Sequence, residues 1–96
     1  MDKTPCVYIL ASRRNGTLYT GVTACLPRRV WEHRNHIVAG FTRRYGIDRL
    51  VYYETCDTIY IAIQREKQIK KYSRRRKIEL IERGNTNWRD LYPEIL

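Results

Sequence analysis

Alternating apolar and polar positions near the start of the chain predict a β-hairpin. Residues 6–10 and 18–22 are both rich in β-forming side chains, and Asn15-Gly16 lies between these two runs. An Asn-Gly pair is a strong hairpin signal because both residues tolerate a positive φ angle. The sequence therefore predicts two antiparallel strands joined by a two-residue turn.

A two-residue turn fixes which side chains lie opposite each other. Leu10 would face Gly21, and Tyr8 would face Thr23. Because side chains alternate along a strand, the hairpin would have one aromatic and polar face and one more apolar face. The first face holds Tyr8, Leu10, Ser12, Tyr19, Gly21 and Thr23, and the second holds Val7, Ile9, Ala11, Leu18, Thr20 and Val22. This pattern has two interpretations. The two phenols converge around Gly21 to form part of a site, or the tyrosines stand there only because tyrosine favours strands.

Helical spacing begins directly after the hairpin and predicts a helix over residues 26–37. Pro27 suits its first turn, where the missing N–H costs nothing, and Gly40 is expected to end it. Its narrow apolar stripe consists of Leu26, Val30, His33 and Ile37. Residues 41–46 read as an irregular connection with basic and aromatic side chains.

A third strand is predicted over residues 49–55, and a helix over residues 59–72 follows it. Asp57 or Thr58 can cap this helix. Its apolar stripe consists of Ile59, Ala62, Ile63 and Ile69.

A last helix is predicted over residues 75–83. Ser73 can serve as its N-cap, and Gly84 is expected to stop it at the C′ position. Beyond it, Trp88 and Leu91 are expected to fold back onto the core.

Glu66 lies inside an otherwise apolar stripe, four residues after Ala62 and three before Ile69. A buried, unpaired carboxylate costs several kcal/mol, so Glu66 needs a cation. An arginine in a structural salt bridge would serve. A metal ion would also serve, because carboxylate oxygens are ligands that Mg²⁺ and Mn²⁺ prefer. The position alone leaves both alternatives open.

Composition adds a partner class to this outline. At 96 residues the chain is expected to form one domain, over residues 1–96. Nineteen Lys and Arg against ten Asp and Glu give a net charge of +9. Such an excess in a small domain favours a polyanionic partner, with nucleic acid as the default, over a basic protein that has no such partner.

Two further observations concern the compartment. No apolar run approaches the length of a membrane span and no signal peptide opens the chain, so we expect a cytoplasmic protein without a membrane partner. The three cysteines, Cys6, Cys25 and Cys56, lack a metal-binding spacing. They are best explained as small thiols in a reducing cytosol.

Five features in order along the chain resemble the GIY-YIG nuclease family. Val7-Tyr8-Ile9 and Tyr19-Thr20-Gly21 stand where that family has its GIY and YIG motifs. The other matches are Arg29 and His33 with the arginine and histidine of the family's first helix, Glu66 with its metal-binding glutamate, and Asn85 with its C-terminal asparagine. The resemblance covers nearly the whole chain and is greatest to small stand-alone bacterial members.

The chain also departs from the family pattern. The first motif reads Val-Tyr-Ile instead of Gly-Ile-Tyr, which still places the tyrosine after a small aliphatic residue. Val22 stands where some excision-repair relatives carry a lysine, and Thr42 stands where homing relatives carry a second histidine. Those relatives also have separate DNA-binding modules, which are not visible in this sequence.

The resemblance implies both a fold and an activity. The fold would be α/β of the α+β type, with a three-stranded, mainly antiparallel sheet flanked by helices. The activity would be hydrolysis of phosphodiester bonds in DNA with one divalent cation, Mg²⁺ or Mn²⁺, in repair or recombination.

It also implies roles for the matching residues. Glu66 would hold the metal ion, and Arg29 would neutralise the phosphate in the transition state. Tyr19 would take the proton from the attacking water. The supporting residues would be Tyr8 and His33, which orient Tyr19 and the water, and Asn85, which hydrogen-bonds within the site.

The identity of the general base stays open at this point. Ionising a free tyrosine at pH 7 costs roughly 4 kcal/mol, because its pKa is about 10. A histidine, with a pKa of about 6.5, needs no such help. Chemistry alone therefore favours His33, whereas the resemblance implies Tyr19.

A basic segment surrounds the predicted metal ligand. It consists of Arg65, Lys67, Lys70, Lys71, Arg74, Arg75, Arg76 and Lys77, with Glu66 as its one acidic residue. Such a cluster is expected to follow a phosphate backbone, although a solvated helix face is the alternative for any single lysine. Base stacking by Tyr45, Tyr52 or Tyr53 is a further possibility, with core packing expected for at least two of them.

An endonuclease is therefore the leading prediction. The alternatives are a nucleic-acid-binding module without useful turnover and an accessory subunit whose specificity comes from a protein partner. The sequence leaves open the substrate structure, DNA against RNA, and the oligomeric state.

Overall fold

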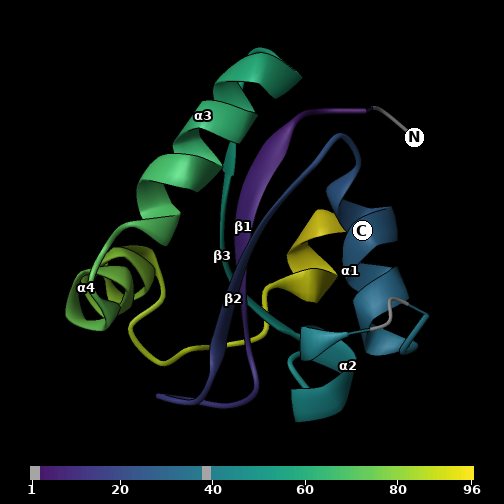
Figure 1. Cartoon of the computed structure of the whole chain (residues 1–96). Helices are drawn as coiled ribbons and strands as arrows, with labels where there is room; N and C mark the ends of the chain where they lie inside the picture. Colours follow the sequence, from purple (N-terminus) through teal and green to yellow (C-terminus); the bar gives the residue numbers. More distant parts are fainter. Residues whose placement is uncertain (1–2, 38–39) are drawn as a thin grey trace.

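A three-stranded antiparallel sheet lies between two groups of helices in the computed structural model, which describes residues 3–37 and 40–96 (Figure 1). In chain order the elements are β1 (Cys6–Ala11), β2 (Leu18–Thr23), α1 (Leu26–Arg34), α2 (Phe41–Tyr45), β3 (Arg49–Thr55), α3 (Ile59–Lys70), α4 (Arg74–Gly84) and the 3₁₀ helix η1 (Tyr92–Ile95). The strand order is β2-β1-β3, so β1 is central. The predicted α+β fold is confirmed.

The two faces of β1 pack against different helices (Figure 1). One face carries Val7, Ile9 and Ala11, and the helix residues packed with them include Ala62, Ile69 and Ile81 of α3 and α4, together with Trp88. The other face carries Cys6, Tyr8 and Leu10, which pack with Leu26 and Val30 of α1 and with Ile47, Leu50 and Leu91. Trp88 and Leu91 are buried, so the predicted return of the C-terminal segment to the core is confirmed.

The hairpin turn differs from the prediction. The backbone N–H of Ser12 donates to the Thr17 carbonyl at 3.0 Å, so residues 13–16 form a wider loop than a two-residue turn. Ser12 Oγ also accepts from the Thr17 N–H at 3.0 Å, and this side-chain bond closes the wider loop. Asn15 adopts a positive φ of 58° and Gly16 does not, so one of the two turn residues behaves as expected.

The wider loop moves the register while the predicted faces survive. Tyr8 pairs with Gly21 and Leu10 pairs with Tyr19, in place of the predicted Tyr8–Thr23 and Leu10–Gly21 pairs. A shift by an even number of residues leaves every side chain on its original face.

The first helix is shorter than predicted. α1 ends at Arg34, with Asn35 as C-cap, and His36 has a positive φ of 56° that interrupts the helix. Ile37 is consequently 58% exposed and leaves the predicted apolar stripe. Residues 38 and 39, just before the predicted stop at Gly40, lie outside the described residues.

The segment at 41–46 is helical, where an irregular connection was predicted. α2 begins after Gly40 and is closed by Gly46, which has a left-handed φ of 62°. Glycine adopts this conformation without a steric penalty, so the short helix can turn directly into β3.

β3 and α3 begin where the sequence predicts, and α4 begins one residue earlier than predicted, at Arg74. β3 covers the predicted residues, Thr58 Oγ1 accepts from the Ile61 N–H at 3.1 Å, and Ser73 Oγ accepts from the Arg76 N–H at 3.2 Å. α3 ends at Lys70, two residues before the predicted end at Tyr72.

Two predictions about α3 and α4 are wrong. Ile59 and Ile63 are 42% and 37% exposed, because α3 buries only a narrow row, Ala62 and Ile69, against the sheet. Gly84 is the last residue of α4 and has no positive φ, so it is not a C′ stop. Asn85 takes the cap position instead.

Among the described residues, no helix combines the length and the apolar character that crossing a membrane requires.

Candidate active site

Gly21 allows two tyrosines to meet on the face of the sheet that carries α1. A Cβ atom at Gly21 would lie 2.5 Å from the Tyr8 hydroxyl oxygen and 3.0 Å from Cε1 of Tyr19. Only glycine leaves that space free. The Tyr8 ring therefore lies across the backbone of β2, with its centroid 6.3 Å from that of Tyr19.

Helix α1 adds a cation and an imidazole to these phenols. Arg29 and His33 are i,i+4 neighbours and project from the same side of the helix. His33 Nε2 lies 3.2 Å from the Tyr8 hydroxyl, and Arg29 Nε donates to that hydroxyl over 3.4 Å. The His33 ring centroid is 5.5 Å from that of Tyr19. We call Tyr8, Tyr19, Arg29 and His33 the tyrosine cluster.

Thr42 completes the surroundings of His33 and is the residue whose role sequence reasoning missed. Its Oγ1 lies 3.0 Å from His33 Nδ1, and its side chain is buried. Arg29 can only donate, so the Tyr8 oxygen accepts from Arg29. Which partner donates in the bonds of His33 Nε2 with Tyr8 and of His33 Nδ1 with Thr42 depends on the His33 tautomer. The one signal for Thr42 in the sequence was that it stands where homing relatives carry a histidine.

Burial sets the protonation of the two innermost groups. It raises the pKa of Tyr8 to about 12, although the hydrogen bond from Arg29 acts in the opposite direction. Burial, assisted by the positive charge of Arg29, lowers the pKa of His33 to about 4. At pH 7 Tyr8 is therefore a neutral phenol and His33 a neutral imidazole.

Tyr19 is the open member of the cluster. His33 is 2% exposed, and its Nε2 is engaged by Tyr8, so water has no direct access to that nitrogen. Tyr19 is half-buried, and its hydroxyl has no hydrogen-bond partner in the described part of the chain. Its contacts with Tyr8 and His33 are ring packing.

A basic groove of about 370 Å³ borders the cluster. Its charged residues are Lys3, Arg28, Arg29 and Glu32, and the end of β2 forms another wall. Arg29 Nη1 lies 3.4 Å from a Glu32 carboxylate oxygen, and Arg28 Nε lies 3.5 Å from the other. Three cations against one carboxylate suit a phosphate group.

Glu66 lies in α3, and its ion-pair partner is a lysine of the same helix. Its side chain is 15% exposed, and Oε2 lies 3.3 Å from Nζ of Lys70, which is 52% exposed. The paired cation is thus a lysine on the same helix, in place of the arginine of the structural alternative, and the metal alternative stays a prediction. An exposed i,i+4 pair stabilises by only about 0.3–0.5 kcal/mol, so it holds the carboxylate weakly.

The charge of Glu66 acts on Tyr8 of the tyrosine cluster. Burial is the main cause of the raised pKa of Tyr8, and the charge of Glu66 is a smaller cause in the same direction. No group of three or more His, Cys, Asp or Glu side chains gathers at a metal-sized site within residues 3–37 and 40–96. A single carboxylate fits Mg²⁺, which keeps several waters and is often bound by one or two carboxylates plus substrate phosphate.

Asn85 is not part of the tyrosine cluster. Its Nδ2 donates to the carbonyls of Val51, at 3.1 Å, and Arg89, at 2.8 Å. Its Oδ1 accepts from the Arg89 N–H at 2.9 Å. Because both amide hydrogens are used on the backbone, Asn85 fastens the C-terminal segment to β3, and within residues 3–37 and 40–96 its side-chain hydrogen bonds go to the backbone and not to the tyrosine cluster.

The basic segment divides into engaged and free cations. Arg65 Nε donates to Glu54 at 2.6 Å, and the Arg76 guanidinium lies 4.1 Å from the Tyr72 ring centroid. The other engaged residues are Lys70 with Glu66, Arg75 with Glu79 and Arg74 with the hairpin loop. Lys67, Lys71 and Lys77 have no partner among the described residues. Arg65 thus has a structural partner, and phosphate binding by the eight residues stays a prediction that these three lysines suit best.

Comparison with known proteins places this arrangement in a family. The model of the GIY-YIG catalytic domain matches residues 4–79. A UPF0213 protein of Staphylococcus saprophyticus is 38% identical over 84 residues, which cover 88% of this chain and all of that protein. A UPF0213 protein of Clostridium perfringens is 41% identical over 78% of this chain and 80% of its own length.

A solved structure agrees with the fold. The solution NMR structure of UPF0213 protein BH0048 from Bacillus halodurans matches with a TM-score of 0.56 and 31% identity, over 91% of this chain and 92% of that one. The family match covers the two tyrosine strands, α1 and Glu66. The chain therefore belongs to the GIY-YIG family, together with these UPF0213 proteins.

Proposed function

We propose that the protein is a metal-dependent endonuclease that hydrolyses phosphodiester bonds in DNA. The observation that carries the proposal is the tyrosine cluster, in which an open phenol, a guanidinium and a buried neutral imidazole meet beside a basic groove. A site that only binds phosphate needs cations and has no use for a phenol that two buried rings hold in place.

Each residue of the cluster has a role in this proposal. Arg29 binds the scissile phosphate and neutralises the charge that develops on it. Tyr19 acts as the general base in its phenolate form: its hydroxyl proton passes to solvent, and the phenolate oxygen then accepts a proton from the attacking water. Tyr8 and His33 stay neutral and fix the Tyr19 ring, and Thr42 holds the His33 ring as a positioning residue.

Glu66 is the residue that would hold Mg²⁺ or Mn²⁺. The bound ion supplies Lewis-acid stabilisation of the phosphate and the leaving oxygen. Glu66 would release Lys70 at little cost when it binds a cation, because the lysine is 52% exposed and returns to solvent. A role in DNA repair or recombination belongs to the proposal and rests on the resemblance alone.

The test is incubation of the purified protein with labelled single-stranded, duplex, branched and RNA substrates in Mg²⁺, Mn²⁺ or EDTA. We expect cleavage of at least one DNA substrate in one of the metals and none in EDTA. Binding of nucleic acid without cleavage in either metal would favour the binding module, for which the basic groove would suffice.

A further inference from the structure

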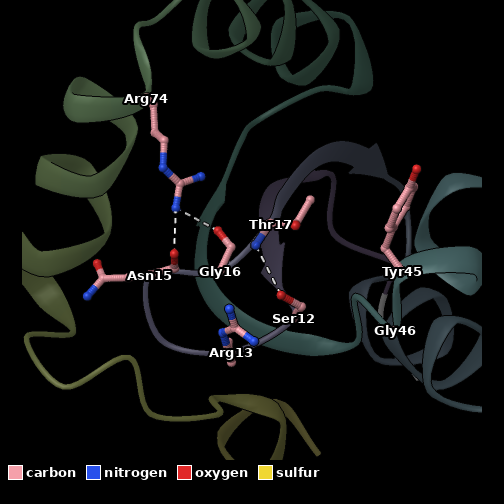
Figure 2. Close-up of a pocket in the computed structure, with 8 residues that line it drawn as sticks. All are labelled: Ser12, Arg13, Asn15, Gly16, Thr17, Tyr45, Gly46 and Arg74. Atoms are coloured by element: carbon pink, nitrogen blue, oxygen red, sulfur yellow. Dashed lines mark hydrogen bonds between the residues drawn. The ribbon is translucent and has the colours of Figure 1, made fainter.

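A second hollow lies between the hairpin loop and α2, apart from the groove at Arg29. It has a volume of about 530 Å³, and its walls include Ser12, Arg13, Thr17, Tyr45 and Arg74 (Figure 2). None of these residues belongs to the tyrosine cluster. We call it the loop hollow.

Two arginines give the loop hollow a positive charge. Arg74 Nη2 donates to the carbonyls of Asn15 and Gly16, each at 2.7 Å, which fixes the guanidinium against the loop (Figure 2). A guanidinium has five N–H donors, so Arg74 keeps donors for a ligand. Arg13 is exposed, and no carboxylate is found among the described residues of the lining.

Tyr45 gives the loop hollow an aromatic wall. The side chain is 51% exposed, and its ring centroid lies 4.9 Å from that of Phe41, which is 49% exposed. The Arg44 guanidinium lies 5.6 Å from the Tyr45 centroid. Tyr52 and Tyr53 are half-buried against the core, so Tyr45 is the member of that predicted trio that is open to a base.

Two segments that line the loop hollow lie next in sequence to residues at the tyrosine cluster. Thr42, which bonds to His33, lies in α2 three residues before Tyr45. Thr17 directly precedes β2 and lies two residues before Tyr19, on the same side of that strand. The loop hollow therefore lies at the end of the hairpin at which β2, the strand of Tyr19, begins.

We propose that the loop hollow binds one nucleotide of a single-stranded segment, with its phosphate on Arg13 and Arg74 and its base stacked on Tyr45. The inference rests on the proposed function and adds to it a substrate class, DNA with an unpaired segment beside the cleaved bond. A base in a duplex is already stacked on both sides, whereas an unpaired base can stack on an exposed ring.

The test measures affinity by fluorescence anisotropy in EDTA, where metal-dependent cleavage does not interfere. The probes are a labelled single-stranded oligothymidine and a duplex of equal length. We expect Tyr45→Ala to weaken single-strand binding roughly tenfold, the effect expected when one base no longer stacks on an aromatic ring, and to leave duplex binding unchanged. Tyr45→Phe keeps the ring and should bind like the wild type.

Two further variants sharpen the comparison. Tyr60→Ala removes a 72% exposed tyrosine from the first turn of α3, at the end of the sheet away from α2, and should leave both affinities unchanged (Figure 1). Arg13→Ala should weaken single-strand binding and lower the salt slope by about 0.7, the value of one phosphate contact on a single strand.

Equal affinities for wild type and Tyr45→Ala, or equal losses on both probes, would overturn the loop-hollow proposal. Cleavage of duplex DNA by both proteins in Mg²⁺ or Mn²⁺ would then show that the proposed function survives without it. If the wild type bound neither probe and cleaved nothing, both proposals would fall together.

Discussion

At the scale of single residues, the absence of a side chain at Gly21 is as important as the groups around it. A Cβ atom there would lie 2.5 Å from the side chain of Tyr8, which is fully buried in the core. We expect Gly21→Ala to lower the free energy of unfolding by about 1–3 kcal/mol through overpacking, as measured by urea denaturation. Gly84→Ala is the matched control, because nothing lies within 4 Å of the new methyl group. Equal stability of Gly21→Ala and wild type would contradict the packing described for Tyr8.

His33 makes stability depend on pH. Burial lowers its pKa to about 4 in the folded protein, from 6.5 in the unfolded chain. Between these values the unfolded state binds more protons, so stability is complete above pH 6.5 and falls as the pH falls towards 4. The loss from this group is about 3 kcal/mol. Urea denaturation from pH 7 to pH 4 measures it. His33→Gln should flatten the dependence of stability on pH. His36→Asn, a change at an exposed histidine, should leave that dependence as in the wild type. Identical profiles for the wild type and His33→Gln would refute the burial effect.

Glu66 distinguishes a metal ligand from a structural ion pair. Its pair with Lys70 is exposed on the lysine side, so Glu66→Gln should leave the melting temperature of the metal-free protein unchanged or higher. Binding of Mn²⁺, followed by electron paramagnetic resonance, should weaken in that variant and persist in Lys70→Gln. A structural pair predicts a large fall in melting temperature for both variants and no change in Mn²⁺ binding.

At the scale of elements, the sequence predicted the strands and helix starts better than the register and helix ends. β3 and the caps Thr58 and Ser73 depend on local chemistry, which is visible in the chain. The hairpin register depended on Ser12, whose side chain closes a wider loop that competes with the Asn-Gly turn. The end of α1 depended on a left-handed His36, for which side-chain pattern gives no signal.

The cations of α3 and α4 differ in whether they already have a partner within the protein. Lys67 and Lys71 are exposed and have no partner in the described structure, whereas Arg65 is bonded to Glu54. We expect the double variant Lys67→Ala/Lys71→Ala to reduce the salt slope of duplex binding by about 0.9 for each phosphate that these lysines neutralise. Arg65→Ala should lower the melting temperature and leave the slope unchanged. The opposite pattern would show that Arg65, and not the lysines, binds phosphate.

At the scale of the whole molecule, local spacing predicted two pairs of residues, and the resemblance implied that the pairs meet. Alternation along the strands puts Tyr8 and Tyr19 on one face, and i,i+4 spacing puts Arg29 and His33 on one side of a helix. Thr42 and Asn85 could not be assigned in this way. The first is brought to His33 by α2, and the second is used by the backbone of β3.

The central claim is that the open phenol of Tyr19 acts on the substrate, and Tyr19→Phe tests it most directly. The variant keeps the ring that packs on Tyr8 and His33 and removes an oxygen that has no partner in the described structure, so stability should barely change. Cleavage in Mg²⁺ or Mn²⁺, measured under single-turnover conditions on whichever substrate the wild type cuts, should slow by roughly 10²–10⁴-fold. Affinity for the same substrate in EDTA should stay at the wild-type value. Cleavage by Tyr19→Phe at a near-normal rate would contradict a catalytic role for this phenol.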